Sequence, residues 1–529
     1  MVAGGRPARA RVAVPTPTTD NDNHVVRFTV LCHRTLGRPV RHRSSTALAA
    51  CALLLTGCFA PGAEPSDGRI KLAMLQPPRS GLTPFSDDAF KLSRWSTAET
   101  LVTLDAAGDA RPGLATGWRR ISEHAWEFTV RPGVTFHDGT ALTSAAVANT
   151  LTRATTASPK PRILDGVELT AEPAGDAVVV TTAAPDPLVP QRLSSPQLAI
   201  LAESAYRADG KVDPVGTGTG PFRLVAVNGT TTATLDRYDG YWGPKAAAEG
   251  IDVSFVPDGT ARAAAIRSGE AHIAEAVPVS QAALLDRATI TEVPMPRTNT
   301  LYLNTKTGPF RDQGLRAAAR EAIDAAEIVR GVYEGRADVA QGLLGPALPW
   351  AAAGRTPLAG RAEATAPAGV AITLATFSDR AELPEVASVL QQQLQDAGFT
   401  VTQVVREYAH IEEDALAGKF DAFILSRATV LDSGDPVAYV QSDFTCAGSF
   451  NIAQLCDGEV DAAVRTAAAT EAGDQRRAAI LAAEAAVLRT DAAIPMLHER
   501  VIQGDATSVV DSAKDPRERT LITSSTRLR

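Results

Sequence analysis

Segments in which a helical pattern is followed at once by a strand pattern recur along this chain, and they constrain its fold more than any other feature. In LPEVASVLQQQLQDAGFTVTQVV (383–405), apolar residues three or four apart form one helical face, Gly398 ends the helix, and a strand follows. The same order recurs where TARAAAIRSG ends at Gly269 before HIAEAV, and before FDAFIL at 420–425. This alternation predicts an α/β fold of open sheets covered by helices.

The amino-terminal region has the composition of a bacterial export signal. Four arginines between positions 34 and 43 precede the apolar run TALAACALLL (46–55), and LTGC follows at 55–58. A run of about ten apolar residues is too short for a transmembrane helix, which needs about 20. We therefore expect residues 1–57 to be a leader segment, with 1–33 added by a start codon assigned too far upstream.

The stretch Leu55-Thr56-Gly57-Cys58 resembles the lipobox of bacterial lipoproteins, in which the peptide is cut before a cysteine that carries lipid. This resemblance predicts a lipid on Cys58 and a linker over 58–68. It places the protein outside the cytoplasm, anchored to the outer face of the cell membrane. The alternative is a plain signal peptide with an incidental cysteine.

The charge balance excludes one class of partner. Residues 1–57 hold eight Arg and two Asp, so without them the 52 basic and 60 acidic residues fall to 44 and 58. A net charge of about −14 argues against nucleic acid, whose phosphates require a basic face. It also argues against binding to anionic lipid by charge, which leaves the lipid on Cys58 as the membrane anchor.

Cysteine and histidine usage predicts a disulfide and no metal site. Cys446 and Cys456 lie ten residues apart, and outside the cytoplasm such a pair predicts a disulfide. A zinc site would need two further ligands, and no histidine lies nearby in sequence. The five histidines after position 57 contain no HExxH spacing.

Enzyme signatures are missing as well. GTGTGPF (216–222) lacks the Lys-Ser/Thr of a phosphate loop, and no GxSxG motif is present. We therefore expect no enzyme activity and no cofactor. A secreted hydrolase with dispersed carboxylates stays open as the competing class.

The stretch EFTVRPGVTFHDGT (127–140) places His137 beside Asp138, which raises the question of a catalytic or metal-binding pair. Alternating apolar residues predict two strands around Arg131-Pro132-Gly133, the second over Val134 and Phe136. Asp-Gly is a favoured turn dipeptide, and adjacent strand residues point to opposite faces. The pair is therefore interpreted as the corner of a hairpin.

Several segments together carry a family resemblance. They are LVTLDAAGDARPGLATGWRRISEHAWEFTVRPGVTFHDGTALT (101–143), GTGPFRL (218–224), DRYDGYWGPKA (236–246), AAIRSGEAHIAEA (264–276), LYLNTKTGPFRDQGLRAAAREAIDAAEIVRGVYEG (301–335), FDAFILSRATVLDSGDP (420–436) and SFNIAQLCDGEVDAAV (449–464). In this order they resemble the family 5 extracytoplasmic solute-binding proteins of ABC importers, the peptide- and nickel-binding group. The resemblance spans about 100–500.

The resemblance implies a periplasmic-binding-protein-like (type II) fold, in which two lobes close on a ligand in the cleft between them. The first lobe would be discontinuous and hold 69–297 and 498–529, and the second would hold 298–497. The chain would cross between the lobes near Pro296 and again near Ile494-Pro495. Two crossings form a hinge, so ligand capture would be a domain closure. The protein would act as a monomer that delivers its ligand to permease subunits in the membrane.

The resemblance also implies ligand-binding residues. Asp432 in LDSGDP matches the aspartate that holds a peptide's ammonium group, although it would alternatively shape the turn before Pro436. Arg380 lies where dipeptide-binding relatives place an arginine for the peptide's carboxylate, and Arg427 is a second basic candidate. Trp95 would supply an apolar wall or pack in the core.

The identity of the ligand stays open between two kinds. The tryptophan that peptide binders often carry just before this motif is missing here, where the sequence reads ATV (428–430). A short peptide is the first interpretation. A nickel chelate carried by a small amino-acid-like metallophore is the alternative, because such chelates are bound through arginines and few protein ligands for the metal.

Overall fold

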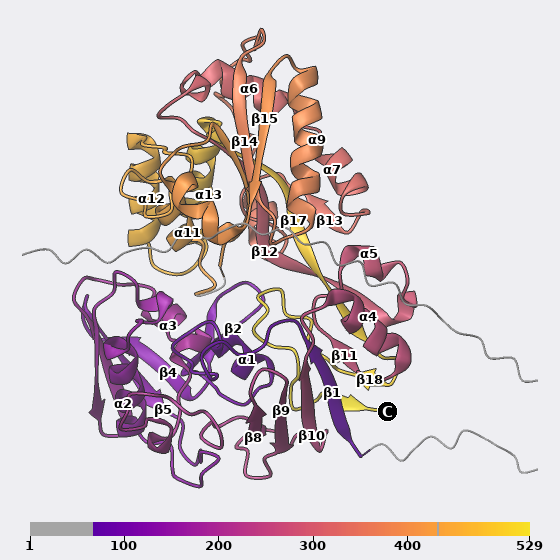
Figure 1. Cartoon of the computed structure of the whole chain (residues 1–529). Coiled ribbons are helices and arrows are strands. Elements are labelled where there is room, and N and C mark those ends of the chain that lie inside the picture. The colour runs from indigo at the N-terminus through magenta and orange to yellow at the C-terminus, as the bar shows by residue number, and fades with distance from the viewer. Residues whose placement is uncertain (1–66, 431–432) are drawn as a thin grey trace, which may run out of the picture. The chain divides into compact units, whose positions relative to one another are not determined.

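A mixed eleven-stranded sheet organises this computed structural model, which describes residues 67–430 and 433–529. Its strand order is β15-β14-β16-β12-β17-β11-β1-β10-β9-β8, with β13 paired to β17. Two long strands, β12 (Ile290–Leu303) and β17 (Ala493–Asp505), are antiparallel neighbours at its centre (Figure 1). β12 pairs with β16 near its carboxyl end, whereas β17 pairs with β11 near its own carboxyl end, so the two strands join the two halves of the sheet.

The first lobe contains the β1 half of this sheet and a separate four-stranded antiparallel sheet, β4-β5-β7-β6. Its strands are β1 (Arg69–Met74), β2 (Val102–Leu104), β3 (Ala110–Pro112), β4 (Ala115–Arg120), β5 (Ala125–Val130), β6 (Leu169–Ala174), β7 (Ala177–Thr182), β8 (Phe222–Asn228), β9 (Thr232–Arg237), β10 (Gly250–Phe255), β11 (Ile273–Ala274), β18 (Val509–Val510) and β19 (Arg527–Leu528). Its α-helices are α1 (Ala89–Arg94), α2 (Ser144–Thr156), α3 (Val189–Arg192), α4 (Gly259–Ser268) and α5 (Val279–Ala282).

The second lobe contains the β14 half of the sheet and most of the long helices (Figure 1). Its remaining strands are β13 (Ala337–Val339), β14 (Ala371–Phe377), β15 (Thr400–Arg406) and β16 (Ala422–Ala428). Its α-helices are α6 (Gln313–Ala322), α7 (Ala325–Gly331), α8 (Pro349–Gly354), α9 (Glu382–Asp396), α10 (Glu412–Leu416), α11 (Val437–Phe444), α12 (Gly458–Ala469) and α13 (Asp474–Arg489).

The hydrophobic cores follow this division. The largest core draws its buried residues only from 301–497, and the others lie among elements of the first lobe. Leu521 and Ile522 pack in the same core as Ile70 and Leu72 of β1, so the carboxyl-terminal segment returns to the first lobe. The fold is therefore the predicted two-lobed α/β fold with a discontinuous first lobe. The predicted lobe boundaries at 297/298 and 497/498 fall inside β12 and β17.

Two prolines lie within β12, where a proline would normally interrupt a strand because it lacks a backbone donor. The pairing of β12 with β17 shifts register between Pro294 and Thr298, and Pro296 lies in this irregular stretch. The Pro296 carbonyl accepts a hydrogen bond from the Thr429 amide at 2.8 Å. The prolines thus occupy a bulge at which the strand passes from one lobe to the other.

Local predictions from periodicity are confirmed at α9, where the helix ends before Gly398 at φ 101° and β15 follows, and at α4, which Gly269 caps at φ 77°. One detail was wrong. The stretch 134–136 forms no strand and contributes only a bridge between Thr135 and Ala141, because β5 pairs with β4 and β7 instead. Helix α2 is capped by Thr143, whose hydroxyl accepts a hydrogen bond from the Ala146 amide. Within 67–430 and 433–529, no helix is both long and apolar enough to cross a membrane.

Candidate ligand-binding site

Charged side chains gather where β12, β16 and β17 meet at the crossing between the lobes. The register pairs Arg297 with Ala428, and Asn299 with Ser426, which brings β12 residues beside Arg427 of β16. Glu499 of β17 comes to the same place, because its carboxylate accepts a hydrogen bond from the Asn299 amide at 2.8 Å. These residues are far apart in sequence, and only the pairing of the three strands brings them together.

Arg380, which precedes α9, forms an ion pair with Glu499. Its Nη1 lies 2.8 Å from Oε2 of Glu499, and the Glu499 side chain is 8% exposed. Burial opposes the charge on Glu499, but the attraction of Arg380 and then of Arg297 outweighs it and lowers the pKa of the carboxyl group. Arg380 thus has a protein carboxylate as its partner, and its role toward a ligand carboxylate stays a prediction.

Arg427 is held in a similar way by Asp443 of α11. Nε and Nη2 of Arg427 each lie 2.8 Å from one carboxylate oxygen, and the side chain of Asp443 is fully buried. This two-bond geometry matches the guanidinium fork to the carboxylate. The guanidinium carbon also lies 4.1 Å from the centre of the Phe450 ring.

Arg297 differs from both, because no carboxylate lies within ion-pair distance of it among the described residues. Its Nη1 donates a long hydrogen bond of 3.4 Å to the Ser426 carbonyl, and its Nε is buried with no partner in the described part of the chain. Burial, and then repulsion by Arg380, lowers the pKa of Arg297 to about 10. The group therefore stays charged at neutral pH with no carboxylate in direct contact among the described residues, while Glu518 and Glu499 attract it from a longer distance. A buried cation without a direct partner is suited to bind an anion.

A second group of charges lies on the first lobe. Arg94 of α1 forms ion pairs with Glu275 and with Glu518, and its Nε donates to the Glu518 carbonyl at 2.7 Å. Glu518 has a left-handed backbone with φ 56°, which is uncommon outside glycine. The negative charge of Glu518 raises the pKa values of both Arg297 and Arg380, although its direct partner is Arg94. The site thus combines one unpaired cation with a carboxylate held on the other lobe.

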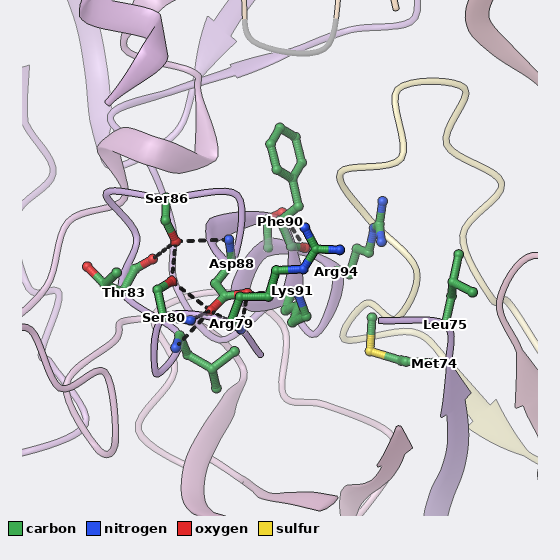
Figure 2. A network of polar contacts seen from close by, with 12 residues as sticks. Met74, Leu75, Arg79, Ser80, Thr83, Ser86, Asp88, Phe90, Lys91 and Arg94 are labelled. Carbon is green, nitrogen blue, oxygen red and sulfur yellow. Dashed lines mark hydrogen bonds and ion pairs between the residues drawn. The ribbon is translucent and has the colours of Figure 1, made fainter. Parts of the chain in front are cut away.

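The loop after β1 is fixed by the buried carboxylate of Asp88 (Figure 2). Asp88 accepts hydrogen bonds from the amides of Arg79 at 3.0 Å and Ser80 at 2.7 Å, and it pairs with Lys91 at 2.9 Å. Burial raises the pKa of Asp88, but the contacts with Lys91 and Ser80 together outweigh burial, and the pKa is lowered. In open α/β sheets such loops at the carboxyl ends of strands border the ligand site.

The remaining predicted residues take different places. Trp95 is 0% exposed, its indole nitrogen lies 3.0 Å from Sδ of Met74, and it packs near Phe255, which is the core-packing alternative. Cys58 and Asp432 lie outside the described residues.

Cys446 and Cys456 are joined in a disulfide in the segment between α11 and α12. The Cys446 amide donates to Asp461 of α12 at 3.0 Å. Cys456 also borders a polar cavity of about 380 Å³, whose lining contains none of the predicted ligand-binding residues. This cavity is therefore separate from the charged site at the crossing.

The pair His137-Asp138 is the corner of a hairpin, as interpreted from sequence. The imidazole Nε2 lies 2.8 Å from the Gly220 carbonyl, and burial lowers the pKa of His137 to about 4. Asp138 instead accepts hydrogen bonds from Thr140 and from the Ser204 hydroxyl at 2.6 Å. The two side chains thus serve separate structural contacts.

Sequence reasoning missed Arg297, Glu499 and Glu518. The available signal was a charged residue in each crossing segment. Arg297 lies in PRTNT, and Glu499 lies in HERVI between His498 and Arg500. In the part of the chain that the structure describes, no three His, Cys, Asp or Glu side chains are grouped so that they could hold a metal ion.

Two lobes joined by crossing strands, with charged groups gathered at the crossing, define a solute-binding protein. Residues 109–451 match the family described as bacterial extracellular solute-binding proteins, family 5, and the chain belongs to this family. Its members are extracytoplasmic binding proteins of ABC importers rather than enzymes.

Curated relatives include the glutathione-binding protein GsiB of Pectobacterium atrosepticum, which is 29% identical over 305 residues. GsiB of Escherichia coli K12 is 28% identical over 296 residues. In both cases the match covers 53% of this chain and 58% of the relative. The chain thus matches a little over half the length of these relatives.

Solved structures show the same fold at low identity. A nickel ABC transporter protein from Bacillus halodurans has a TM-score of 0.72 and 24% identity, covering 87% of this chain and 100% of that one. HbpA2 from Haemophilus parasuis has a TM-score of 0.76 at 20% identity and the same coverage. DppA from Helicobacter pylori, solved with the peptide STSA, has a TM-score of 0.68 at 19% identity, covering 87% and 98%.

Proposed function

We propose that this protein is the binding component of an ABC importer, which captures a short peptide by lobe closure and delivers it to the membrane permease. The observation that carries the proposal is the unpaired guanidinium of Arg297 at the crossing between the lobes. A carboxylate on the ligand would supply the anion that this group lacks among its described neighbours. Charge-assisted hydrogen bonds of this kind are among the stronger ones, particularly where water is excluded.

Arg380 and Arg427 lie near Arg297, but we do not propose that they bind the ligand carboxylate themselves. Arg380 and Arg427 are each engaged by a carboxylate of the protein, so their charges are largely compensated. We infer that they hold the strand ends in place around Arg297. Glu518, and Asp432 as predicted from the family motif, are the candidates for the ammonium group of the same ligand.

A peptide with a free carboxylate and a free amine fits a site that offers both charges. Glutathione is the first ligand to test, because relatives named for it share 28–29% identity with this chain. A nickel chelate is the alternative, and one structural neighbour was solved in complex with Ni(L-His)2. Such a complex would bind through the chelator's carboxylates, in keeping with the lack of a metal-ligand cluster among the described residues.

Titration calorimetry of the purified protein with glutathione, the peptide STSA and Ni(L-His)2 tests the proposal. We expect saturable binding of a peptide, and weaker or no binding of its carboxyl-terminal amide. If the protein binds Ni(L-His)2 and neither peptide, the ligand is the nickel chelate and not a peptide. Turnover of a peptide without stable binding would favour the hydrolase and overturn the proposal.

The proposed anchor and partners follow from the sequence. A lipid on Cys58 would hold the protein at the outer face of the membrane, where a monomer would meet the permease subunits. The acidic chain, with a formal net charge of −8, makes a nucleic-acid partner unfavourable.

A further inference from the structure

The turn between β2 and β3, Asp105–Asp109, lies on the first lobe and contacts the second lobe at several points. The indole nitrogen of Trp350, in α8, donates to the Ala107 carbonyl at 3.2 Å. Nη2 of Arg477, in α13, donates to the Asp109 carboxylate at 2.7 Å. Between these two contacts, Gly108 packs so closely on Gly434 that a Cβ at position 108 would lie 2.9 Å from the Gly434 carbonyl oxygen.

The shape of this turn is fixed by the first lobe alone. Oδ1 of Asp105 accepts the amides of Ala107 at 2.9 Å and Asp109 at 3.0 Å, which closes the turn. Arg517, in the carboxyl-terminal segment and only 5% exposed, donates to the carbonyls of Leu104, Asp105 and Ala106. The turn therefore needs no contact with the second lobe to keep its conformation.

The surface that receives the turn, which we call the seat, consists of Trp350, Gly434 and Arg477. Arg476, beside Arg477 and 2% exposed, binds the carboxylate of Asp435 with two hydrogen bonds of 2.6 and 3.1 Å. Arg476 also donates to the carbonyls of Ala467 and Thr470, each at 2.6 Å. It thus ties the Gly434 part of the seat to helix α13.

The seat is connected to the charged site through α11. This helix begins directly after Asp435-Pro436 and carries Asp443, the carboxylate that holds Arg427 at the site. One short segment therefore contacts the turn at Gly434 and continues into α11, whose Asp443 binds Arg427. The seat is thus joined through one continuous segment to Asp443, the partner of Arg427.

We propose that the turn Asp105–Asp109 is a latch, which docks on the seat when the lobes close and slows the release of ligand. The proposal rests on the function proposed above, because a latch matters only in a protein that captures by closure. Among the described residues, its contacts with the seat are a single indole bond, one ion pair with side chains 24% and 39% exposed, and a glycine-to-glycine contact. Such a contact set is weak enough to open repeatedly.

The test compares variants of the latch pair with matched controls. Asp109→Asn and Arg477→Gln each remove one charge of the pair, and the double variant removes both. Asp474→Asn is the first control, because Asp474 pairs with the same arginine at 3.0 Å but is 96% exposed and lies on the same helix. Glu471→Gln is the second control, since it removes another ion pair between the lobes, with Arg120 at 2.7 Å.

The rate of glutathione dissociation, measured by stopped flow, is the first readout. We expect each latch variant to raise this rate about fivefold, and the double variant to raise it no further, because an exposed ion pair contributes up to about a factor of five. The controls should stay within twofold of the parent. Equal effects in latch variants and controls, or additive effects in the double variant, would overturn the proposal.

Small-angle X-ray scattering without ligand is the second readout, and it does not depend on the proposed ligand. Asp109→Asn and Arg477→Gln should increase the radius of gyration, since they favour separated lobes, whereas Asp474→Asn should not. If glutathione does not bind but the latch variants show the larger radius of gyration, glutathione is rejected as the ligand and the latch is supported. An unchanged radius in both latch variants would reject the latch even if glutathione binds.

Discussion

Replacing Arg297 with methionine should strengthen the fold and weaken ligand binding at the same time. The residue is largely buried, has no carboxylate partner among the described residues, and is repelled by Arg380 and Arg427. Methionine fills the volume of the arginine stem without bringing in a charge. Arg297→Lys is the matched control, because it keeps the charge at a similar length.

The magnitudes follow from the environment of the guanidinium. The difference between a pKa of about 10 and the ordinary value for arginine corresponds to about 3 kcal/mol, by which the folded surroundings disfavour the charge. Because solvent reaches part of the side chain, the gain in stability should be smaller, about 1–2 kcal/mol. Loss of a buried contact with a ligand carboxylate should cost about 2–5 kcal/mol, which is an affinity at least about thirtyfold lower.

Two measurements on the same protein preparations are needed. Urea unfolding without ligand should give a higher midpoint for Arg297→Met than for the parent, with Arg297→Lys near the parent. Calorimetry with glutathione, or with whichever ligand the parent binds, should give the opposite order. A methionine variant that is less stable than the parent and binds within threefold of it would refute the role of Arg297 as an unpaired ligand-binding cation.

Three further predictions concern other parts of the chain. His137 and His498 are buried, and burial lowers their pKa values to about 4. Between about pH 6.5 and 4 the unfolded chain therefore binds more protons than the folded chain. As the pH falls through this range, the free energy of unfolding should decrease by up to about 3 kcal/mol per histidine. Urea midpoints of His137→Gln and His498→Asn should depend less on pH there, and an unchanged slope would reject the assignment. The disulfide between Cys446 and Cys456 should leave neither thiol free in the unreduced, unfolded protein, and replacing both with serine should cost about 2–3 kcal/mol; labelling of both thiols would disprove the link. Cys58→Ser should move the protein from the membrane fraction to the soluble fraction in a cell fractionation, and continued retention would exclude the lipid anchor.

Regular elements of the fold could be predicted where a local pattern determines them. The apolar face of α9, its end before Gly398 and strand β15 all follow from consecutive residues, and the structure confirms them. The prediction of a strand at 134–136 was wrong because a strand forms only where another strand pairs with it, and the local pattern does not show that partner. The partners of β5 are β4 and β7, and β7 comes from a segment about 50 residues later in the chain.

The candidate site could be predicted only as a set of arginines, because their partners are distant in sequence. Arg380 and Glu499 are 119 positions apart, and no local pattern shows that this carboxylate neutralises that arginine. Arg427 and Asp443 are 16 positions apart but on different elements, β16 and α11. The unpaired state of Arg297 is a property of three-dimensional neighbours, so the sequence placed this arginine in a crossing segment without indicating that it lacks a direct partner.

Native mass spectrometry of the protein purified from its own host, followed by fragmentation of whatever it releases, identifies the ligand and shows whether Arg297 holds it. We expect a small bound molecule that carries at least one free carboxylate and an amine, present on the parent and on Arg297→Lys. The same molecule should be lost from Arg297→Met. A bound molecule without a carboxylate, or equal retention of a carboxylate ligand by Arg297→Met, would contradict the assignment of the site.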